Sequence, residues 1–374
     1  MSRPPTQWAR PVVAAALALG ACAPPAAEGA RTAARVPAPQ TAAARPAAPH
    51  PTRPGAPALA PDTPLVRVAM GSCNHQDRPQ PLWAPILAGA PQLWIWAGDN
   101  VYGDTEDMGV LAAKYAKQRG QPDYQAFARR VPLIGVWDDH DYGANDAGRE
   151  YPRRTESQQL ALDFLGEPPD GPRRAREGMY AAYSYGPPGR RVKVLLLDTR
   201  AFRDPLPPRG ATSDGDVLGE AQWQWLEREL ATSDAQVHLV VSSIQVLPEE
   251  HPFEKWANFP RARQRLFETI GAARAPGVVF VSGDRHIAEL SRLDSSAVGY
   301  PVYELTTSGL THTWSEVRDE PNRYRVGPLV VALNYGTLDI DWGEPVPRLT
   351  LRVRDPENAA RIEHSFVAGS VRRR

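Results

Sequence analysis

The sequence predicts an α/β fold, in which short buried strands alternate with helices. Six apolar runs of four to six residues each stop abruptly at a polar cluster, and amphipathic stretches separate several of them. Short apolar runs bounded in this way are typical of buried strands. Their alternation with helices favours sheets with helices packed on them. A chain of 374 residues with 42% hydrophobic content can bury a sizeable core.

Two segments precede the predicted domain. Residues 1–21 carry basic residues and then a small apolar run, which is the layout of a secretory signal peptide. The small pair before Cys22 resembles the lipobox of bacterial lipoproteins. We therefore expect export, cleavage before Cys22, and lipid attachment that tethers the chain to the periplasmic or cell-surface face of a bacterial membrane. An ordinary cleaved signal peptide is the alternative. Residues 22–64, rich in Pro and Ala, are predicted to form a disordered linker.

The predicted catalytic domain spans residues 65–367, and residues 368–374 are expected to form a flexible tail. Apolar runs predict strands at 65–70, 92–97, 132–137, 192–197, 238–241 and 278–281. Periodic stretches predict helices at 111–118, 220–230 and 261–273. From Val302 onward the runs, including 328–334 and 349–353, have no helices between them, so we expect a later antiparallel portion. We interpret Trp83, Trp94 and Trp96 as core residues.

Composition excludes some classes of function. The formal net charge is zero, so no global field attracts nucleic acid, and we predict no specific nucleic-acid binding. The two cysteines do not indicate a disulfide scaffold. If the protein acts on anions, it must therefore bind them through a local group of charges. Composition does not indicate the oligomeric state.

Polar residues of metal-binding and acid–base types follow four of the predicted strands. These clusters begin at Cys73, Asp99, Asp139 and Asp284. Ligands gather at the carboxyl ends of strands in α/β sheets. Cations held close together can bind a phosphate ester, lower the pKa of a bound water and stabilise the attacking and leaving oxygens. The four clusters therefore predict a metal centre that hydrolyses phosphate esters.

The chain resembles the alkaline phosphatase D (PhoD-like) phosphatases, a branch of the calcineurin-like metallophosphoesterases. The resemblance rests on four motifs in order: Gly71-Ser72-Cys73, Gly98-Asp99-Asn100-Val101-Tyr102-Gly103-Asp104, Trp137-Asp138-Asp139-His140-Asp141 and Gly283-Asp284-Arg285-His286. It runs from about Val66 to about Thr313. It implies a four-layer αββα sandwich of two mixed β-sheets flanked by helices, and a hydrolase acting on phosphoric ester bonds.

The resemblance also implies a role for each motif residue. The metal ligands it implies are Cys73, Asp99, Tyr102, Asp139, Asp284 and His286. Asp99 would bridge two metal ions, with Cys73 and Tyr102 on ferric iron. His140 would contact the phosphate and protonate or polarise the leaving oxygen. Asp138 is expected to cap or to form hydrogen bonds rather than to bind a metal, whereas Asp141, Asn145 and Asn100 are candidates for a supporting role or for calcium binding.

The implied metals are Fe³⁺ and Ca²⁺. A phenolate and a thiolate favour a trivalent or soft transition ion, whereas clustered carboxylates favour calcium or magnesium. Zinc, manganese and magnesium remain alternatives on sequence alone.

Three further residues have competing interpretations. Arg285 is a catalytic candidate, since its planar fork can clamp a phosphate oxygen. The alternative is an ion pair with Glu289 or Asp284. Arg200 is interpreted as a salt-bridge residue. His312 either approaches the site from the later sheet or lies on the surface.

The sequence thus predicts an exported, metal-dependent phosphoesterase that hydrolyses phosphate monoesters, diesters or both by attack of a metal-bound hydroxide. One alternative is a phosphodiesterase or phospholipase that acts on membrane lipids or wall polymers. The other is a noncatalytic lipoprotein that binds metal or phosphate. His140 argues against the binding protein, because a pure binding site does not require an acid–base group.

Overall fold

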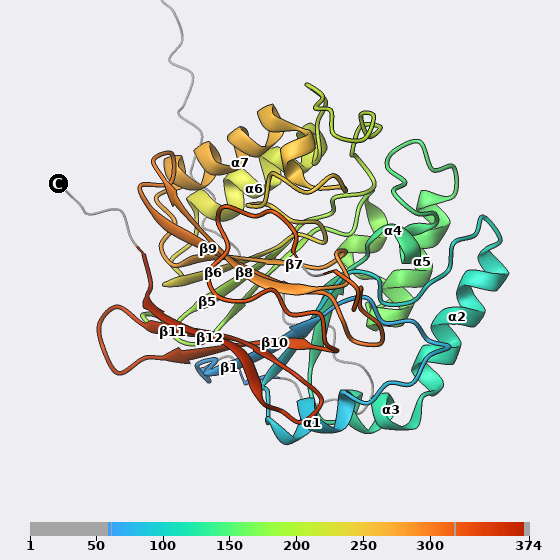
Figure 1. Ribbon diagram of the computed structural model, residues 1–374, viewed down its shortest axis with the longest axis horizontal. Coiled ribbons are helices and arrows are strands. Elements are labelled where there is room, and N and C mark those ends of the chain that lie inside the picture. Colours follow the sequence, from blue (N-terminus) through green and yellow to red (C-terminus); the bar gives the residue numbers. More distant parts are fainter. Residues whose placement is uncertain (1–58, 61, 318, 370–374) are drawn as a thin grey trace, which may run out of the picture. The chain divides into compact units, whose positions relative to one another are not determined.

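The computed structural model describes residues 59–60, 62–317 and 319–369 (Figure 1). The predicted signal peptide at 1–21, the lipidation residue Cys22 and most of the 22–64 linker lie outside the described residues, as does the tail from residue 370. Within the described part of the chain, no helix has the length and hydropathy needed to cross a membrane.

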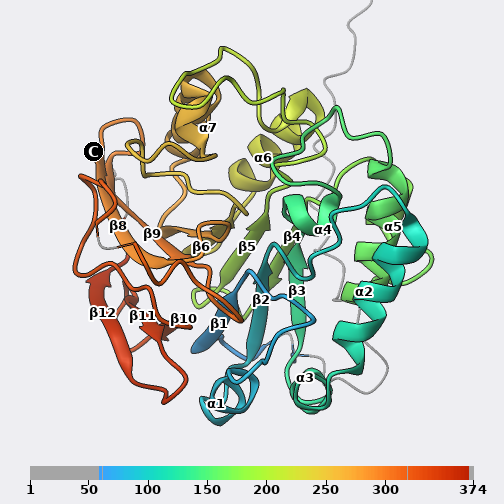
Figure 2. The same cartoon turned by 45° about the vertical axis from the view of Figure 1, so that its right-hand side comes forward.

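The first sheet, sheet A, has six strands in the order β12-β11-β10-β1-β2-β3. Its strands are β1 (Arg67–Gly71), β2 (Leu93–Ala97), β3 (Leu133–Val136), β10 (Tyr335–Asp341), β11 (Arg348–Arg354) and β12 (Ala360–Val367). β1, β2 and β3 are parallel neighbours, and β10, β11 and β12 extend the sheet in antiparallel fashion from β1. The sheet is therefore mixed, and the carboxyl ends of β1, β2 and β3 share one edge (Figure 2).

The second sheet, sheet B, has six strands in the order β4-β5-β6-β7-β9-β8. Its strands are β4 (Ala181–Tyr185), β5 (Val192–Leu196), β6 (Val237–Val241), β7 (Val278–Ser282), β8 (Ala288–Ser295) and β9 (Tyr300–Thr307). The four central strands, β5, β6, β7 and β9, are parallel, and the two edge strands are antiparallel to them.

Helices cover the outer faces of both sheets (Figure 1). They are α1 (Trp83–Ala88), α2 (Met108–Gly120), α3 (Pro122–Ala128), α4 (Asp139–Tyr142), α5 (Arg154–Leu165), α6 (Gly219–Ala231) and α7 (Pro260–Ala273), with short 3₁₀ turns η1 (Pro172–Ala175) and η2 (Trp256–Asn258). Short sequence signals determine where several of these helices begin and end. Asp107 accepts hydrogen bonds from two N–H groups of the first turn of α2. Gly166 ends α5 in the left-handed conformation, and Pro260 opens α7.

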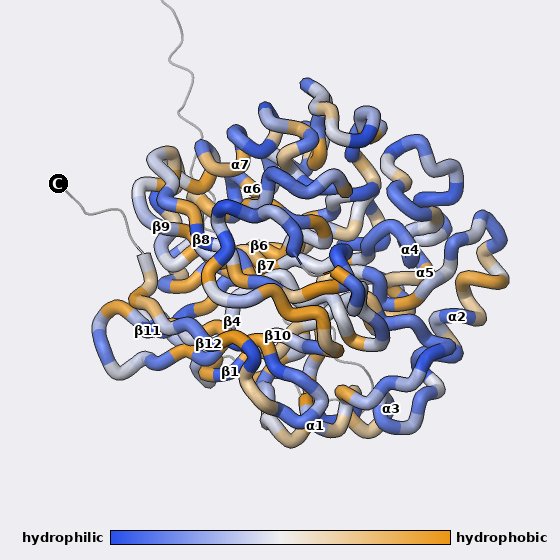
Figure 3. Tube along the Cα trace, in the orientation of Figure 1, coloured by the Kyte–Doolittle hydropathy of each residue, from blue (hydrophilic) through white to orange (hydrophobic). Residues whose placement is uncertain are grey.

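Three clusters of buried hydrophobic residues lie between the layers of the fold. The core between the sheets is built from residues such as Val68, Ile95, Val194, Leu239 and Leu338. Trp83, Trp94, Trp96 and Phe127 pack between sheet A and its helices, which confirms the three tryptophans as core residues. Trp223, Leu266 and Phe280 pack between sheet B and α6 and α7. Figure 3 shows hydrophobic strands inside and hydrophilic loops outside. The chain therefore folds as the predicted four-layer αββα sandwich.

The later part of the chain departs from the prediction in two ways. Residues 328–334 are not a strand, because Val330 and Asn334 form only isolated bridges and the next strand begins at Tyr335. Pro328 offers no N–H to a ladder. β9 pairs in parallel with β7, so the region after Val302 is not wholly antiparallel. The sequence pattern also missed β4, β8 and β12, whose polar outer faces interrupt the apolar signal.

Candidate metal centre

The predicted ligands meet where one edge of sheet A faces the same edge of sheet B. Cys73 follows β1, Asp99 follows β2, and Asp139 begins the short helix after β3. Asp284 and His286 follow β7 of the other sheet. The packing of the two sheets therefore brings together residues that are more than two hundred positions apart in the sequence, such as Cys73 and His286.

Three groups of side chains lie at this edge. Within each group, the possible ligand atoms all lie within 4.8 Å of one another. The groups are Cys73 with Asp99 and His286, Asp99 with Asp139 and His140, and Asp138 with Asp139 and Asp284. Asp99 belongs to the first two groups, which places its carboxylate between them. The arrangement suits more than one metal ion, with Asp99 shared between them.

The ligand loops hold an unusual backbone conformation. Cys73, Asp99, Asp284 and His286 have φ values of 59°, 50°, 67° and 53°, in the left-handed region. Such conformations are uncommon for residues with a side chain and tend to cluster at functional sites. Each of these loops turns sharply at the end of its strand, and the side chain is thereby aimed into the space between the sheets.

Two motif glycines allow these turns to meet. A Cβ on Gly98 would lie 2.6 Å from the Cβ of Asp138, and one on Gly283 would lie 2.3 Å from Ser72 Oγ. Both distances are shorter than side chains tolerate, so any larger residue would push the strand ends apart. Gly98 therefore allows the ends of β2 and β3 to lie close together within sheet A, and Gly283 allows the end of β7 in sheet B to approach the end of β1 in sheet A.

Cys73 lies at the base of the centre and is fully buried. Its Sγ is 3.3 Å from Asp99 Oδ2 and 3.0 Å from Ser308 Oγ. Burial raises the pKa of its thiol to about 11. The sequence analysis missed Ser308, although it directly follows β9 and so carries the same strand-end signal as the other clusters.

Tyr102 places its hydroxyl beside the same carboxylate. The hydroxyl donates to Asp99 Oδ2 at 3.3 Å and lies 2.9 Å from His286 Nε2. Burial raises its pKa well above the usual value of a phenol. A thiol, a phenol and an imidazole therefore surround one side of Asp99.

Two more histidines, His312 and His75, lie beside His286 and Tyr102. The ring of His312 is 4.3 Å from that of His286, so His312 does approach the site from the later sheet. The ring of His75 stacks on Tyr102 at 4.9 Å. His75 directly follows the Cys73 motif in sequence, yet the sequence analysis overlooked it.

His140 is held by two acidic residues. Its backbone N–H donates to Asp99 Oδ1 at 3.3 Å, and its Nδ1 lies 2.7 Å from Asp104 Oδ1. Burial opposes the charged ring, but Asp99 and Asp104 outweigh it and raise the pKa of His140 to about 11. Asp104 was part of the quoted motif but was given no role.

The carboxylates of the third group are buried and close together. Burial raises the pKa of Asp138 well above its usual value and that of Asp284 to about 7. Asp138 caps α4, as predicted, and its Oδ1 accepts a hydrogen bond from Arg200 Nε at 2.6 Å. Arg200 also pairs with Glu254 at 2.6 Å, which confirms its salt-bridge role.

The remaining carboxylate and amide candidates occupy different positions. Asp141 Oδ2 accepts hydrogen bonds from the side chains of Asn100 at 2.6 Å and Tyr115 at 3.2 Å. Asn100 and Asp141 are both fully buried and bonded to each other behind the ligand loops. Asn145 is instead exposed at the rim of the adjoining cavity.

Arg285 is buried and pairs with a residue that the sequence analysis did not consider. Its Nη2 donates to Glu320 at 2.7 Å, so neither Glu289 nor Asp284 is its ion-pair partner. The guanidinium also lies over the rings of Phe253 and Trp314, at 4.1 and 4.9 Å from their centroids. Arg285 is therefore fixed by a carboxylate and a pair of aromatic rings at the wall of the site.

A cavity of about 690 Å³ opens beside the centre. His140, Asp284, Arg285 and His286 line it next to the ligand loops. The rest of its lining is mixed: Leu206, Pro207, Pro252, Phe253 and Trp314 are apolar, whereas Asn145, Asp146, Glu150, Arg209, Glu254 and Asn258 are polar or charged. The cavity is much larger than a phosphate group, so a substrate with an organic portion fits beside the centre.

The residues present fit metal ions. Among the described residues, Asp138 Oδ2, Asp139 Oδ1 and His286 Nδ1 are buried without a hydrogen-bond partner. Unpaired buried polar atoms are costly and require a partner. Closely spaced carboxylates also repel one another unless protons or cations neutralise them. Cations at the three groups would satisfy the orphaned atoms and the excess negative charge together.

Fold and site together define a metal-dependent phosphoesterase. The chain belongs to the PhoD-like phosphatase family, whose model matches residues 68–325. It is therefore a hydrolase that acts on phosphoric ester bonds, with a phosphate ester as its substrate. The family also implies divalent metal cofactors.

Solved structures with the same fold include a phosphatase described as PhoD, with a TM-score of 0.67 and 18% identity over 84% of this chain and 73% of that one. GAP50, the anchor in the inner membrane complex of Plasmodium, has a TM-score of 0.55 and 11% identity over 82% of this chain and 90% of that one. At these identities the likeness concerns the fold alone. No curated protein sequence matches the chain.

Proposed function

We propose that this PhoD-like phosphatase uses ferric iron together with calcium to hydrolyse phosphate monoesters or diesters outside the cytoplasm. The observation that carries the choice of iron is the convergence of the Cys73 thiol and the Tyr102 phenol on one carboxylate, Asp99. Thiolate and phenolate ligands favour a trivalent or soft ion, whereas the all-carboxylate group of Asp138, Asp139 and Asp284 favours a hard ion such as calcium.

Each metal would be held by a different set of residues. Iron would be held by Cys73, Asp99, Tyr102 and His286, and calcium by Asp99, Asp139 and Asp284. When bound, two such ions activate water for attack and neutralise the charge on the phosphoryl oxygens. The protein contributes the fixed positions of the ligands, which the left-handed loops and the close glycines determine.

His140 supplies the proton for the departing oxygen. Asp104 holds Nδ1 and so orients the ring, which leaves Nε2 for the substrate. The Asp104 carboxylate favours the protonated form of the ring. A protonated imidazole at this position can give its proton to the leaving alkoxide or phenoxide. The apolar part of the cavity lining, with Phe253 and Trp314, supports a substrate with an organic leaving group.

The exported, lipid-anchored location is proposed from the sequence of residues 1–22 alone. Its test is the distribution of the full-length chain between membrane and soluble fractions after detergent partition. Cys22→Ala should move the chain to the soluble fraction. An unchanged membrane-bound fraction would contradict lipidation at Cys22.

The metal assignment is tested on the full chain after chelation, with iron, calcium, both, zinc, manganese or magnesium restored. We expect hydrolysis of an aryl phosphate monoester or the matching diester to need iron and calcium together. An iron–phenolate absorption band should accompany loading with iron, independently of turnover. Tyr102→Phe should remove the band, whereas Tyr115→Phe, a buried tyrosine that bonds Asp141, should keep it. Full activity with zinc alone and no such band would contradict the assignment.

A further inference from the structure

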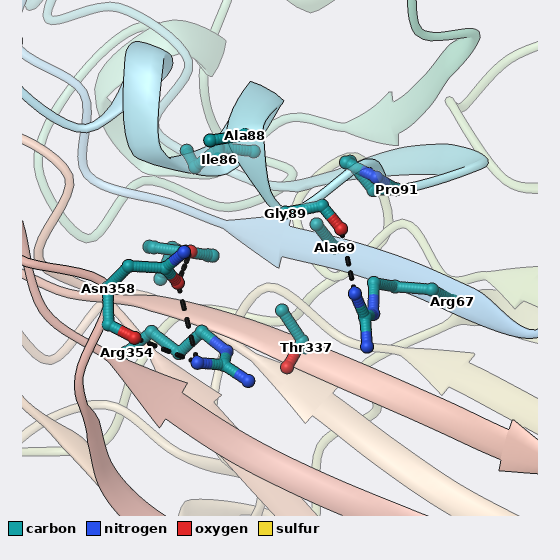
Figure 4. Close-up of a pocket in the computed structure, with 10 residues that line it drawn as sticks. Arg67, Ala69, Ile86, Ala88, Gly89, Pro91, Thr337, Arg354 and Asn358 are labelled. Carbon is teal, nitrogen blue, oxygen red and sulfur yellow. Dashed lines mark hydrogen bonds between the residues drawn. The ribbon is translucent and has the colours of Figure 1, made fainter.

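A second cavity, of about 180 Å³, lies on the outer face of sheet A under the end of α1 (Figure 4). Its lining residues are Arg67, Ala69, Ile86, Ala88, Gly89, Pro91, Tyr335, Thr337, Arg354 and Asn358. None of them belongs to the three ligand groups of the metal centre. This cavity is therefore a separate feature of the fold that the phosphoesterase reaction does not use.

Two arginines, Arg67 of β1 and Arg354 of β11, flank the cavity on either side of β10. Arg67 of β1 donates from Nη1 to the carbonyl oxygen of Gly89 at 2.8 Å and from Nε to Asp339 Oδ1 at 2.5 Å. Arg352 of β11 binds the same Asp339 carboxylate. Arg67 also donates from Nη2 to Asp339 Oδ2 at 3.2 Å, and Arg352 pairs in addition with Glu363 at 2.7 Å, so both arginines have a carboxylate partner. Arg67 is therefore fixed in place, with N–H groups left over for a ligand.

Arg354 has no acidic partner. Its Nη1 donates to the Asn358 carbonyl oxygen at 2.8 Å. Within residues 59–60, 62–317 and 319–369, no carboxylate lies at ion-pair distance from its guanidinium. The charge of Arg354 therefore makes the cavity net positive. A guanidinium with several free N–H groups is suited to a forked contact with an oxyanion.

Thr337 lies between the two arginines on β10, the strand that separates β1 from β11 (Figure 4). It is only 4% exposed, and in the described part of the chain its Oγ1 has no hydrogen-bond partner. A buried hydroxyl without a partner costs free energy, so such groups usually have a ligand or water that completes them. The hydroxyl therefore points to a bound group that is polar.

The wall around these groups is rigid and partly apolar. Tyr335 is buried, and its hydroxyl donates to Asn358 Oδ1 at 2.7 Å. Asn358 has a φ of 63°, in the left-handed region, and is held there by Tyr335 and Arg354. Ile86 and Ala88 of α1 close the other side. A cavity with fixed donors on one side and small apolar residues on the other admits only a small ligand.

We propose that this cavity is a binding site for a small tetrahedral oxyanion of the phosphate type. Arg354 supplies the charge, Arg354 and Arg67 supply N–H donors, and Thr337 supplies a hydroxyl hydrogen bond. The volume suits inorganic phosphate or the phosphate of a small ester. Either anion would supply the negative charge that pairs with Arg354, which has no carboxylate partner among the described residues.

The test is calorimetric titration of inorganic phosphate into the full chain after chelation, so that the metal centre is empty of ions. Arg354→Gln should weaken phosphate binding roughly tenfold or abolish it, since a charge-assisted contact is removed. The matched control is Arg348→Gln, which removes the same charge from an exposed position on the same strand and should bind as the wild type does. Equal binding by the wild type and Arg354→Gln would overturn the proposal, as would an equal loss in the control.

The variant Thr337→Val tests phosphate binding without a loss of folding stability. The replacement has nearly the same shape and removes only the unpaired hydroxyl, so the fold should be as stable as before or more so. We expect it to weaken phosphate binding several-fold. Unchanged phosphate binding in this variant would refute the part assigned to Thr337 and with it the site as described.

The source and class of the anion are resolved by two further titrations. Glycerol 3-phosphate that binds as inorganic phosphate does would show that the phosphate of a small ester is accepted. Binding of inorganic phosphate alone would assign the site to the free ion. Acetate that displaces phosphate at equal concentration would contradict the phosphate class.

Discussion

Replacing His140 with glutamine should slow the hydrolysis of esters with poor leaving groups far more than that of activated aryl esters. The two neighbouring carboxylates raise its pKa from the ordinary 6.5 to about 11. These carboxylates favour the protonated form of the ring. The side chain is 16% exposed, so solvent screens this preference only weakly. Because Nδ1 is held by Asp104, the proton available to the substrate is the one on Nε2.

General acid catalysis contributes about 10²–10⁴-fold to rate when the leaving oxygen needs a proton. We therefore expect kcat to fall by about 10²–10⁴-fold for an alkyl phosphate and by roughly tenfold or less for a nitrophenyl phosphate. Metal content, measured by elemental analysis, must be the same in the variant and the wild type. His75→Gln, which removes a histidine that stacks on Tyr102 without touching Asp99, serves as the control. An equal loss with both esters would show that His140 binds phosphate rather than donating a proton.

Three further outcomes are expected. Asp99→Asn should lower bound metal per chain and abolish hydrolysis, because Asp99 is shared by two ligand groups; unchanged metal content in elemental analysis would disprove the sharing. Arg200→Met should cost about 3–5 kcal/mol in urea unfolding, since Asp138 and Glu254 lose a buried partner, whereas a near-zero change would show that neither carboxylate depends on it. Burial lowers the pKa of His238 from 6.5 in the unfolded chain to about 4 in the folded chain. As the pH falls below 6.5, the unfolded chain therefore binds a proton at His238 before the folded chain does. The stability that is present above pH 6.5 is lost as the pH falls towards 4. This loss amounts to ~3 kcal/mol and should disappear in His238→Gln, as followed by urea unfolding at several pH values.

Local sequence patterns were sufficient for the central strands and for the main helices. The runs that became β1, β2, β3, β5, β6 and β7 are apolar on both faces, so burial alone identifies them. β8 and β12 carry polar residues on an outer face, and residues 328–334 are apolar without joining a sheet. In these segments the pairing partner, rather than the local pattern, decides the structure.

The site shows the same division. Asp99, Tyr102 and His140 were accessible to sequence reasoning because each follows a strand in a recognisable motif. Ser308 carries the same strand-end signal, but its contact with Cys73 was not accessible, and neither was the contact of Glu320 with Arg285, because the fold brings these partners together from different segments of the chain. Their partners were therefore invisible until the sheets were packed.

The sequence by itself determined the strand-end clusters, the family and the kinds of ligand, because these depend on residue type and short spacing. Only the tertiary structure decided that Ser308 contacts Cys73 and that Arg285 pairs with Glu320. It also revealed the cavity between Arg67 and Arg354, which are 287 positions apart in the numbering. The physical reason is that such contacts arise from the stacking of two sheets and the pairing of distant strands, and no local pattern encodes either distance.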